Sequence, residues 1–263
     1  MNFNRIWALV LRYTINLRHN WDRLVDMFYW PALDLFLWGL TGLYLAQLTN
    51  TNKSEQYLFV ILSGLIFWVV IWRAQYEITT NLLAELWDRN IVNLFTTPLK
   101  VSEWISAFII FGFAKTLASL SFSAFLSFII YHYNIFYFGG YLVAYIAILL
   151  LTGWAGGFFF SAFIIRYGQR IQTLAWVGIT LIAPFSAVYY PLSILPDWAQ
   201  KVGLFIPSTY TFEAIRAALF TGHVSYDKLL LSFALGILYL ILAIWFFVFM
   251  FNKSRKLGLG RLV

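Results

Sequence analysis

The sequence contains no cysteine and little charge. Its 263 residues include no Cys, three His and only 11% charged residues, whereas soluble domains average about 25% charged residues. The absence of Cys excludes disulfides, thiolate metal sites and a cysteine nucleophile. Hydrophobic residues make up 62% of the chain, and a soluble fold of this length cannot bury so much apolar surface. We therefore expect a membrane protein, and not a soluble enzyme, a disordered chain or a fibrous protein.

The sequence also lacks the motifs of common catalytic and nucleotide-binding sites. No segment matches G-x-x-x-x-G-K-[ST], so an ATP-driven process would need a nucleotide-binding partner chain. His19, His132 and His223 lie in separate segments and indicate neither a metal site nor a base beside a nucleophile. We expect no catalytic residue, metal or cofactor on this chain. The net charge is +7, but the sequence has no basic run interleaved with aromatic residues. We therefore expect no nucleic-acid partner.

Long uncharged intervals predict an all-α polytopic membrane protein with a single domain over residues 1–263. A hydrocarbon core about 30 Å thick requires about 20 apolar residues per helix. Unbroken apolar runs favour helices over the alternating strands of a barrel. We predict six transmembrane helices, near residues 27–48, 57–76, 104–131, 141–165, 171–190 and 229–251.

Residues 1–25 read as an amphipathic helix and not as a cleavable signal peptide. Apolar residues such as Phe3, Trp7 and Val10 recur on one face, and Arg5 and Arg12 on another. The pattern is typical of a helix lying among lipid headgroups. A helix packed on protein is the alternative.

The distribution of Lys and Arg predicts the orientation. Basic residues are denser in segments 1–26, 73–103, 166–172 and 252–263 than in the intervening hydrophilic segments. Cytoplasmic loops carry the excess of Lys and Arg. We therefore expect both termini in the cytoplasm and a multi-pass protein of the cytoplasmic membrane, in contact with membrane lipid.

Two segments between the predicted spans have features of their own. In segment 77–98, Leu82, Leu86 and Leu94 recur at helical spacing and Pro98 stops the helix, which predicts an amphipathic cytoplasmic helix suited to press on a soluble partner. Segment 187–228 is divided by prolines into pieces near 197–205 and 208–220. These pieces are too short to span a membrane, so we expect re-entrant or interfacial helices.

Ionisable residues within spans are costly and are functional candidates. We hypothesise that Asp34 and Lys115 form a pair or face a common water-filled path, or that they only fix the register of two helices. Arg73 and Glu77, four residues apart, are expected to pair locally.

Two further spacings predict local contacts. Glu213 and Arg216 are three residues apart and are expected to pair, with contact to a polar headgroup as the functional alternative. Gly153, Gly157 and Ser161 form a small-residue stripe that allows close packing, within the subunit or at a dimer seam. Aromatic residues near Tyr131–Tyr141 are typical of an interfacial belt, with platforms for a sugar or flat drug as the alternative.

Three stretches carry a resemblance to a known family. They are Glu85-Leu86-Trp87-Asp88-Arg89-Asn90 with Thr97-Pro98-Leu99, Tyr190-Pro191-Leu192-Ser193-Ile194-Leu195-Pro196-Asp197-Trp198, and Ile206-Pro207-Ser208-Thr209-Tyr210-Thr211-Phe212-Glu213-Ala214-Ile215-Arg216. In these stretches and in its order of features, essentially the whole chain resembles the permease subunits of ABC transporters in the type-2 exporter family. Ile206 and Ser208 depart mildly from the family pattern, where Asn and Leu are common.

The resemblance implies a homodimer of permease subunits, each clamped by a cytosolic ABC ATPase that holds ATP and Mg. The first and fifth spans would face the partner copy and line the path. Contact with the ATPase would fall to Glu85, Trp87, Asp88, Arg89 and Asn90. The outer re-entrant segment would contain Pro191, Pro196, Trp198, Pro207, Glu213 and Arg216.

We therefore expect an ATP-driven exporter of an amphipathic cargo, whether lipid-like, glycan or drug-like. An ion-coupled secondary transporter and a membrane-embedded enzyme are the alternatives. The first would favour broken spans in matching halves, and the second a polar cluster at one depth.

Overall fold

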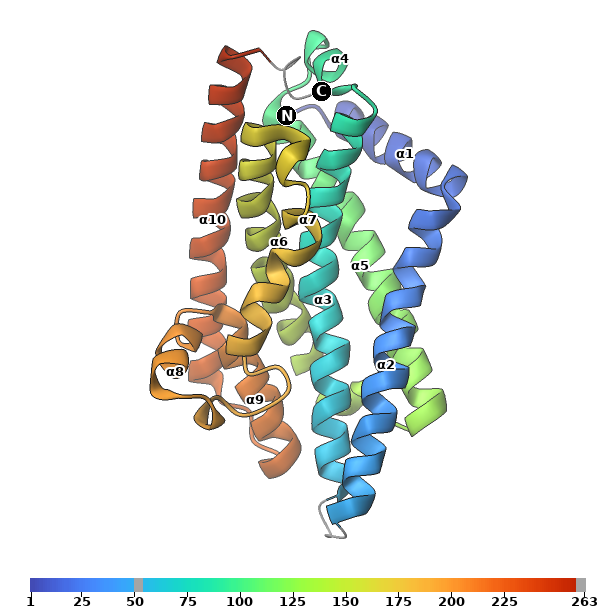
Figure 1. The fold of residues 1–263 in the computed structure, drawn as a ribbon, viewed down its shortest axis with the longest axis vertical. Coiled ribbons are helices and arrows are strands. Elements are labelled where there is room, and N and C mark those ends of the chain that lie inside the picture. Colours follow the sequence, from blue (N-terminus) through green and yellow to red (C-terminus); the bar gives the residue numbers. More distant parts are fainter. Residues whose placement is uncertain (50–53, 259–263) are drawn as a thin grey trace.

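The chain folds into a bundle of long helices that run between two ends (Figure 1). The computed structural model describes residues 1–49 and 54–258, and within them no β-strand occurs. The long helices are α2 (Trp21–Thr49), α3 (Ser54–Trp87), α5 (Val101–Tyr131), α6 (Tyr141–Tyr167) and α10 (Tyr226–Lys256). Helices α1 (Phe3–His19) and α4 (Ile91–Thr96) lie at one end, where the last turns of α10 also lie. We call it the α4 end.

Helix α3 is the centre of the bundle. It packs against α2, α5, α6 and α9 (Pro207–Thr221). At about 1.5 Å per residue, its 34 residues are about 50 Å long, which exceeds a hydrocarbon core of about 30 Å. One apolar core lies toward the α4 end, around Leu82 and Trp104. The other lies toward the opposite end, around Phe67 and Tyr145, and α3 contributes to both.

The stripe of Gly153, Gly157 and Ser161 brings α6 close to α3. A Cβ atom at Gly153 would lie 2.6 Å from the carbonyl oxygen of Ile71, and one at Gly157 would lie 3.0 Å from Ile78. Ser161 continues this buried face. The small residues therefore lie at a helix contact within the subunit.

Among the described residues, four helices are long and apolar enough to cross a membrane. They span Gln56–Trp87, Val101–Tyr131, Tyr141–Ile171 and Tyr226–Lys256, and they include the predicted spans 57–76, 104–131, 141–165 and 229–251. The predicted span 27–48 lies inside α2, which is long but is not among the four.

The predicted span 171–190 is not one continuous α-helix. It is divided into η2 (Gly168–Ile171), α7 (Leu174–Val177) and η3 (Ile179–Phe185), with turns between them. Gly178 and Pro184 have low helix preference, and Pro184 has no amide hydrogen to donate. A 3₁₀ helix rises about 2.0 Å per residue, so this apolar segment reaches further than an α-helix of the same length.

The expected amphipathic helix over 77–98 is also wrong as a separate element. Helix α3 continues to Trp87, and the chain turns at Arg89, whose φ is +54°, before α4 begins. Leu82 and Leu86 are buried in the core. Arg73 and Glu77 led to the expected helix boundary near residue 76. Both are buried inside the bundle and do not mark its end.

Helix α1 has two apolar faces. Ile6, Leu9 and Tyr13 pack toward α5, whereas Trp7 and Ile15 are exposed on the other side. The helix ends at His19, and residues 21–25, expected to be part of it, belong to α2.

Short helices form the segment that follows η3. They are η4 (Leu192–Ile194), α8 (Asp197–Gly203) and α9, close to the pieces expected at 197–205 and 208–220. Pro191 and Pro196 directly precede η4 and α8, and Pro207 is the first residue of α9, where its missing amide hydrogen is not needed.

We predict that Gly153→Ala destabilises the protein by about 1–3 kcal/mol, because the new methyl group meets backbone atoms of α3 that cannot move aside. Thermal unfolding in detergent measures the effect. Gly140→Ala is the matched control, since a Cβ there meets nothing within 4 Å. Equal melting temperatures for the two variants would contradict the tight α3–α6 contact.

Candidate functional site

A chain of four acidic and basic side chains, three of them buried and Asp26 partly exposed, lies between α2, α3 and α5. Asp26 Oδ2 lies 2.9 Å from Arg73 Nη1, Arg73 Nη2 lies 2.9 Å from Glu77 Oε1, and Glu77 Oε2 lies 2.6 Å from Lys115 Nζ. The side chains of Arg73 and Glu77 are 0% exposed. Two negative and two positive charges balance, so the cluster carries no net charge into the interior. We call these four residues the ionic network.

The network corrects one expectation and refines another. Arg73 and Glu77 form a pair, but inside the bundle and not at an exposed helix end. The expected pair of Asp34 and Lys115 does not form, because Lys115 binds Glu77. Asp34 lies two turns further along α2 than Asp26, at a different depth of the bundle. Sequence reasoning missed Asp26, which the i, i+4 spacing of Arg73 and Glu77 does not indicate.

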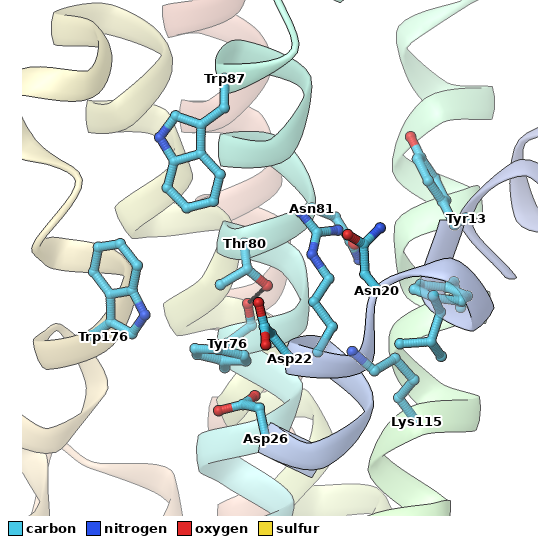
Figure 2. A pocket seen from close by; sticks show the side chains of 13 residues that line it. Tyr13, Asn20, Asp22, Asp26, Tyr76, Thr80, Asn81, Trp87, Lys115 and Trp176 are labelled. Atoms are coloured by element: carbon cyan, nitrogen blue, oxygen red, sulfur yellow. Dashed lines mark hydrogen bonds between the residues drawn. The ribbon is translucent and has the colours of Figure 1, made fainter. Parts of the chain in front are cut away.

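A cavity of about 340 Å³ opens beside the network, at the α4 end (Figure 2). Trp87 at the end of α3 stacks on Trp176 of α7, with ring centroids 6.3 Å apart, and Figure 2 shows both on the side away from Lys115. The polar residues that line the cavity are Asn20, Asp22, Arg23, Asp26, Thr80, Asn81 and Lys115, and the other lining residues are Tyr13, Leu17, Tyr76, Trp87, Phe111 and Trp176.

A second cavity of about 210 Å³ continues along the same face of α3. It is lined by Trp30, Pro31, Asp34, Trp68, Val69, Trp72 and Thr180. Trp68, Trp72, Tyr76 and Thr80 are four residues apart in turn, so they follow one face of α3 from the second cavity to the first. The two cavities therefore follow one another along α3, beside α2 and segment 174–180, with α1 and α5 also lining the first, and together they make up one composite surface. We call it the furrow.

The tip of α3 is exposed at the α4 end. Trp87 is 43% exposed, and Asp88 and Arg89 are exposed beside it. Glu85, one turn earlier, is 1% exposed and accepts hydrogen bonds from Arg12 Nη2 at 2.5 Å and Asn90 Nδ2 at 2.8 Å. The five residues expected to contact an ATPase are thus of two kinds. Glu85 and Asn90 hold the turn, and Trp87, Asp88 and Arg89 form its accessible surface.

Helix α1 is attached to both sides of this turn. Besides the Arg12–Glu85 bond, Arg5 Nη1 donates to the carbonyl of Pro98 at 2.5 Å, and the amide of Asn2 donates to Glu103 Oε1 at 2.7 Å. Partial burial lowers the pKa of Arg12, but the hydrogen bond and charge of Glu85 outweigh it and leave the pKa raised. Segment 88–100 is therefore fixed to α1 near each of its ends.

Comparison with known families decides the identity. The ABC-2 type transporter family matches residues 4–220, a range that contains the furrow, the α3 tip, helices α2 to α8 and all of α1 but its first residue. This chain belongs to the ABC-2 type transporter family. It is therefore a permease subunit of an ABC transporter, a multi-pass membrane protein of a family without a nucleotide-binding domain of its own. No curated protein matches the sequence.

In this permease, Glu213 and Arg216 bind each other and the backbone. Glu213 Oε1 accepts from Arg216 Nη1 at 2.8 Å and from the amide of Leu192 at 3.0 Å, and Arg216 Nη2 donates to the carbonyl of Ala187 at 2.8 Å. Burial lowers the pKa of Arg216, and Glu213 partly offsets this. The pair attaches turn 187–192 to α9, whereas Trp198 is 63% exposed.

We predict that Glu77→Gln and Lys115→Met each destabilise the permease by about 3–5 kcal/mol, because each leaves an unbalanced charge in the interior. The double variant leaves Asp26 and Arg73 as a neutral pair. We expect it to be less destabilised than the sum of the single variants, a coupling measured by thermal unfolding in detergent. Additive losses would contradict the bond between Glu77 and Lys115.

Proposed function

We propose that this permease exports an amphipathic cargo across the cytoplasmic membrane and that a separate cytosolic ATPase, which holds ATP and Mg, drives it. The exposed tip of α3 carries this proposal. Trp87, Asp88 and Arg89 offer an aromatic and charged contact surface at the end of the helix that packs against most of the bundle. A force applied there acts on the whole subunit, because α3 contributes to both apolar cores.

The charge distribution supports a cytoplasmic α4 end. Figure 1 places the N-terminus and the last turns of α10 at this end. Lys201 and Lys228 belong to the part of the chain toward the opposite end. Basic residues collect at the α4 end, as expected of a cytoplasmic surface, and they are Arg5, Arg12, Arg18, Arg89, Lys100, Arg166, Arg170, Lys253, Arg255 and Lys256. The exposed apolar face of α1, with Trp7 and Ile15, suits a helix among the headgroups at this surface.

Six crossings of the membrane fit the path of the chain. Helices α2 and α5 lead away from the α4 end, and α3, α6 and α10 lead toward it. Segment 168–185 leads away from it again, which supports its assignment as the fifth span. Helices α8 and α9 then suit short re-entrant or interfacial helices on the outer side.

The furrow supports a dimer of two copies of this chain. Two of the elements beside it, α2 and segment 174–180, expose large apolar side chains such as Trp30, Leu37, Tyr44 and Val177. A second copy packed on these elements would enclose both furrows in a common path. ATP binding by the partner would tilt the two subunits against each other and widen one end of this path. The ATP-bound partner must therefore bind the two permease conformations with unequal affinity.

The ionic network allows ion-coupled secondary transport, the alternative function, to be weighed against ATP-driven export. A proton relay needs a carboxylate that gains and loses its proton during the cycle. Both carboxylate oxygens of Glu77 are bound by cations, Oε1 by Arg73 and Oε2 by Lys115. This pairing favours a structural role for the network and, with it, the ATP-driven exporter.

We predict that Trp87→Ala and Arg89→Gly each lower the ATPase activity of the copurified complex by at least about fivefold and leave the permease in the membrane. Glycine tolerates the positive φ of Arg89, so this variant removes the charge and keeps the turn. The complex is isolated by a tag on the permease, and a P-loop ATPase is identified in it by mass spectrometry.

Trp198→Ala is the matched control, because Trp198 is an exposed tryptophan on α8, away from the α4 end. Wild-type activity of both tip variants, or ATP hydrolysis by the permease alone, would exclude the proposed coupling.

A further inference from the structure

Flat aromatic faces recur along the furrow and beyond it. Trp87 stacks on Trp176, and Trp72 stacks on Tyr76 with ring centroids 5.0 Å apart. Further along, Trp38 of α2 stacks on Tyr189 at 6.1 Å. Trp30 and Trp68 lie between these levels, in the second cavity. A ligand that moves along this face meets an aromatic surface at each level.

Polar groups without partners accompany the aromatic faces. Asn81 is 4% exposed and lines the first cavity, and its side-chain nitrogen has no hydrogen-bond partner among the described residues. A buried amide left without a partner costs free energy, so a ligand that binds it gains affinity. Asp22, Arg23 and Asp34 also line the furrow, and no ion pair joins any of them to another described side chain.

These features select against two classes of ligand. An acyl chain would leave the carboxylates and Asn81 without hydrogen bonds. A strongly charged ligand would meet charges of both signs, because Asp22 and Arg23 are neighbours and the network is neutral. A neutral ring with apolar faces and a rim of hydroxyl groups satisfies both kinds of surface. Its C–H groups pack on the negative faces of the aromatics, and its hydroxyls donate to carboxylates and accept from Asn81 and Arg23.

We propose that the furrow binds the neutral sugar rings of a glycan-bearing cargo, an inference that rests on the proposed export function and names the class of its cargo. The cavity of about 340 Å³ at the α4 end receives the first ring. Cavities of this size bind small ligands. The cavity of about 210 Å³ and the aromatic pair of Trp38 and Tyr189 provide the following surfaces.

The test compares three probes with the same eight-carbon tail: octyl glucoside, octyltrimethylammonium and octanol. Each is radiolabelled and titrated below its micelle concentration onto the permease in lipid nanodiscs, with empty nanodiscs as the blank. We expect saturable binding of octyl glucoside alone. The single variant Trp176→Ala and the double variant Trp72→Ala/Trp176→Ala should each weaken the binding of octyl glucoside by about tenfold, because each variant removes an aromatic face. Trp245→Ala on α10, which is 65% exposed and outside the furrow, should leave it unchanged.

The variants Asp34→Asn and Asp22→Asn distinguish a site that binds a sugar from a site that binds a cation. An amide still accepts and donates hydrogen bonds, so we expect less than a threefold change for octyl glucoside. Saturable binding of octyltrimethylammonium that is lost in these variants would overturn the proposal. Binding of octyl glucoside that equals the binding of octanol would also overturn the proposal. So would binding of octyl glucoside that is unchanged in the Trp176→Ala variant. Trp176 is 36% exposed, so this single variant is expected to fold even if the double variant does not.

The binding assay contains neither ATPase nor nucleotide. Its failure would therefore leave the pairing with an ATPase untouched. Absence of an ATPase from the purified complex would in turn exclude the export function without changing the result of the sugar titration.

Discussion

The bond from Glu77 to Arg73 and Lys115 fixes how α2, α3 and α5 lie against one another. A carboxylate that is 0% exposed needs its counterions, and only one relative depth of the three helices supplies Lys115 from α5 and, through Arg73, Asp26 from α2. A shift of one helical turn along α3, about 5.4 Å, would separate these charges. The furrow depends on this register, because α3 and α2 both line it.

The same register explains why the furrow holds both aromatic and polar residues. Trp72 and Tyr76 flank Arg73 in sequence, and the Arg73 guanidinium lies 5.5 Å and 5.1 Å from their ring centroids. The Arg73 guanidinium thus contacts the rings of Trp72 and Tyr76 through cation–π interactions while it forms ion pairs with Asp26 and Glu77. On α2, Asp26 turns toward the network, whereas Asp22, one turn before it, and Asp34, two turns after it, form no ion pair with another described side chain.

Much of this architecture could be predicted from sequence, because it depends on local patterns. Uncharged intervals located the four described helices that are long and apolar enough to cross a membrane, and prolines located α8 and α9. The i, i+4 spacing identified the pair of Arg73 and Glu77. The partner of Lys115 could not be predicted, since it depends on the relative depth of α3 and α5. Apolar composition does not distinguish 3₁₀ from α geometry, so segment 171–190 was expected to be one helix. The furrow likewise combines residues of α1, α2, α3, α5 and segment 174–180, which are far apart in the chain.

Helix α1 connects these features to the surface of the bundle. It holds Glu85 through Arg12 and Pro98 through Arg5, so segment 88–100 cannot move independently of α1. Tyr13 of the same helix lines the first cavity, and burial, with the charge of Glu85, raises the pKa of its hydroxyl, which therefore stays neutral. In the proposed mechanism, a displacement of the α3 tip moves α1 as well. Opening of the furrow at the α4 end is then coupled to the position of a helix in the headgroup layer.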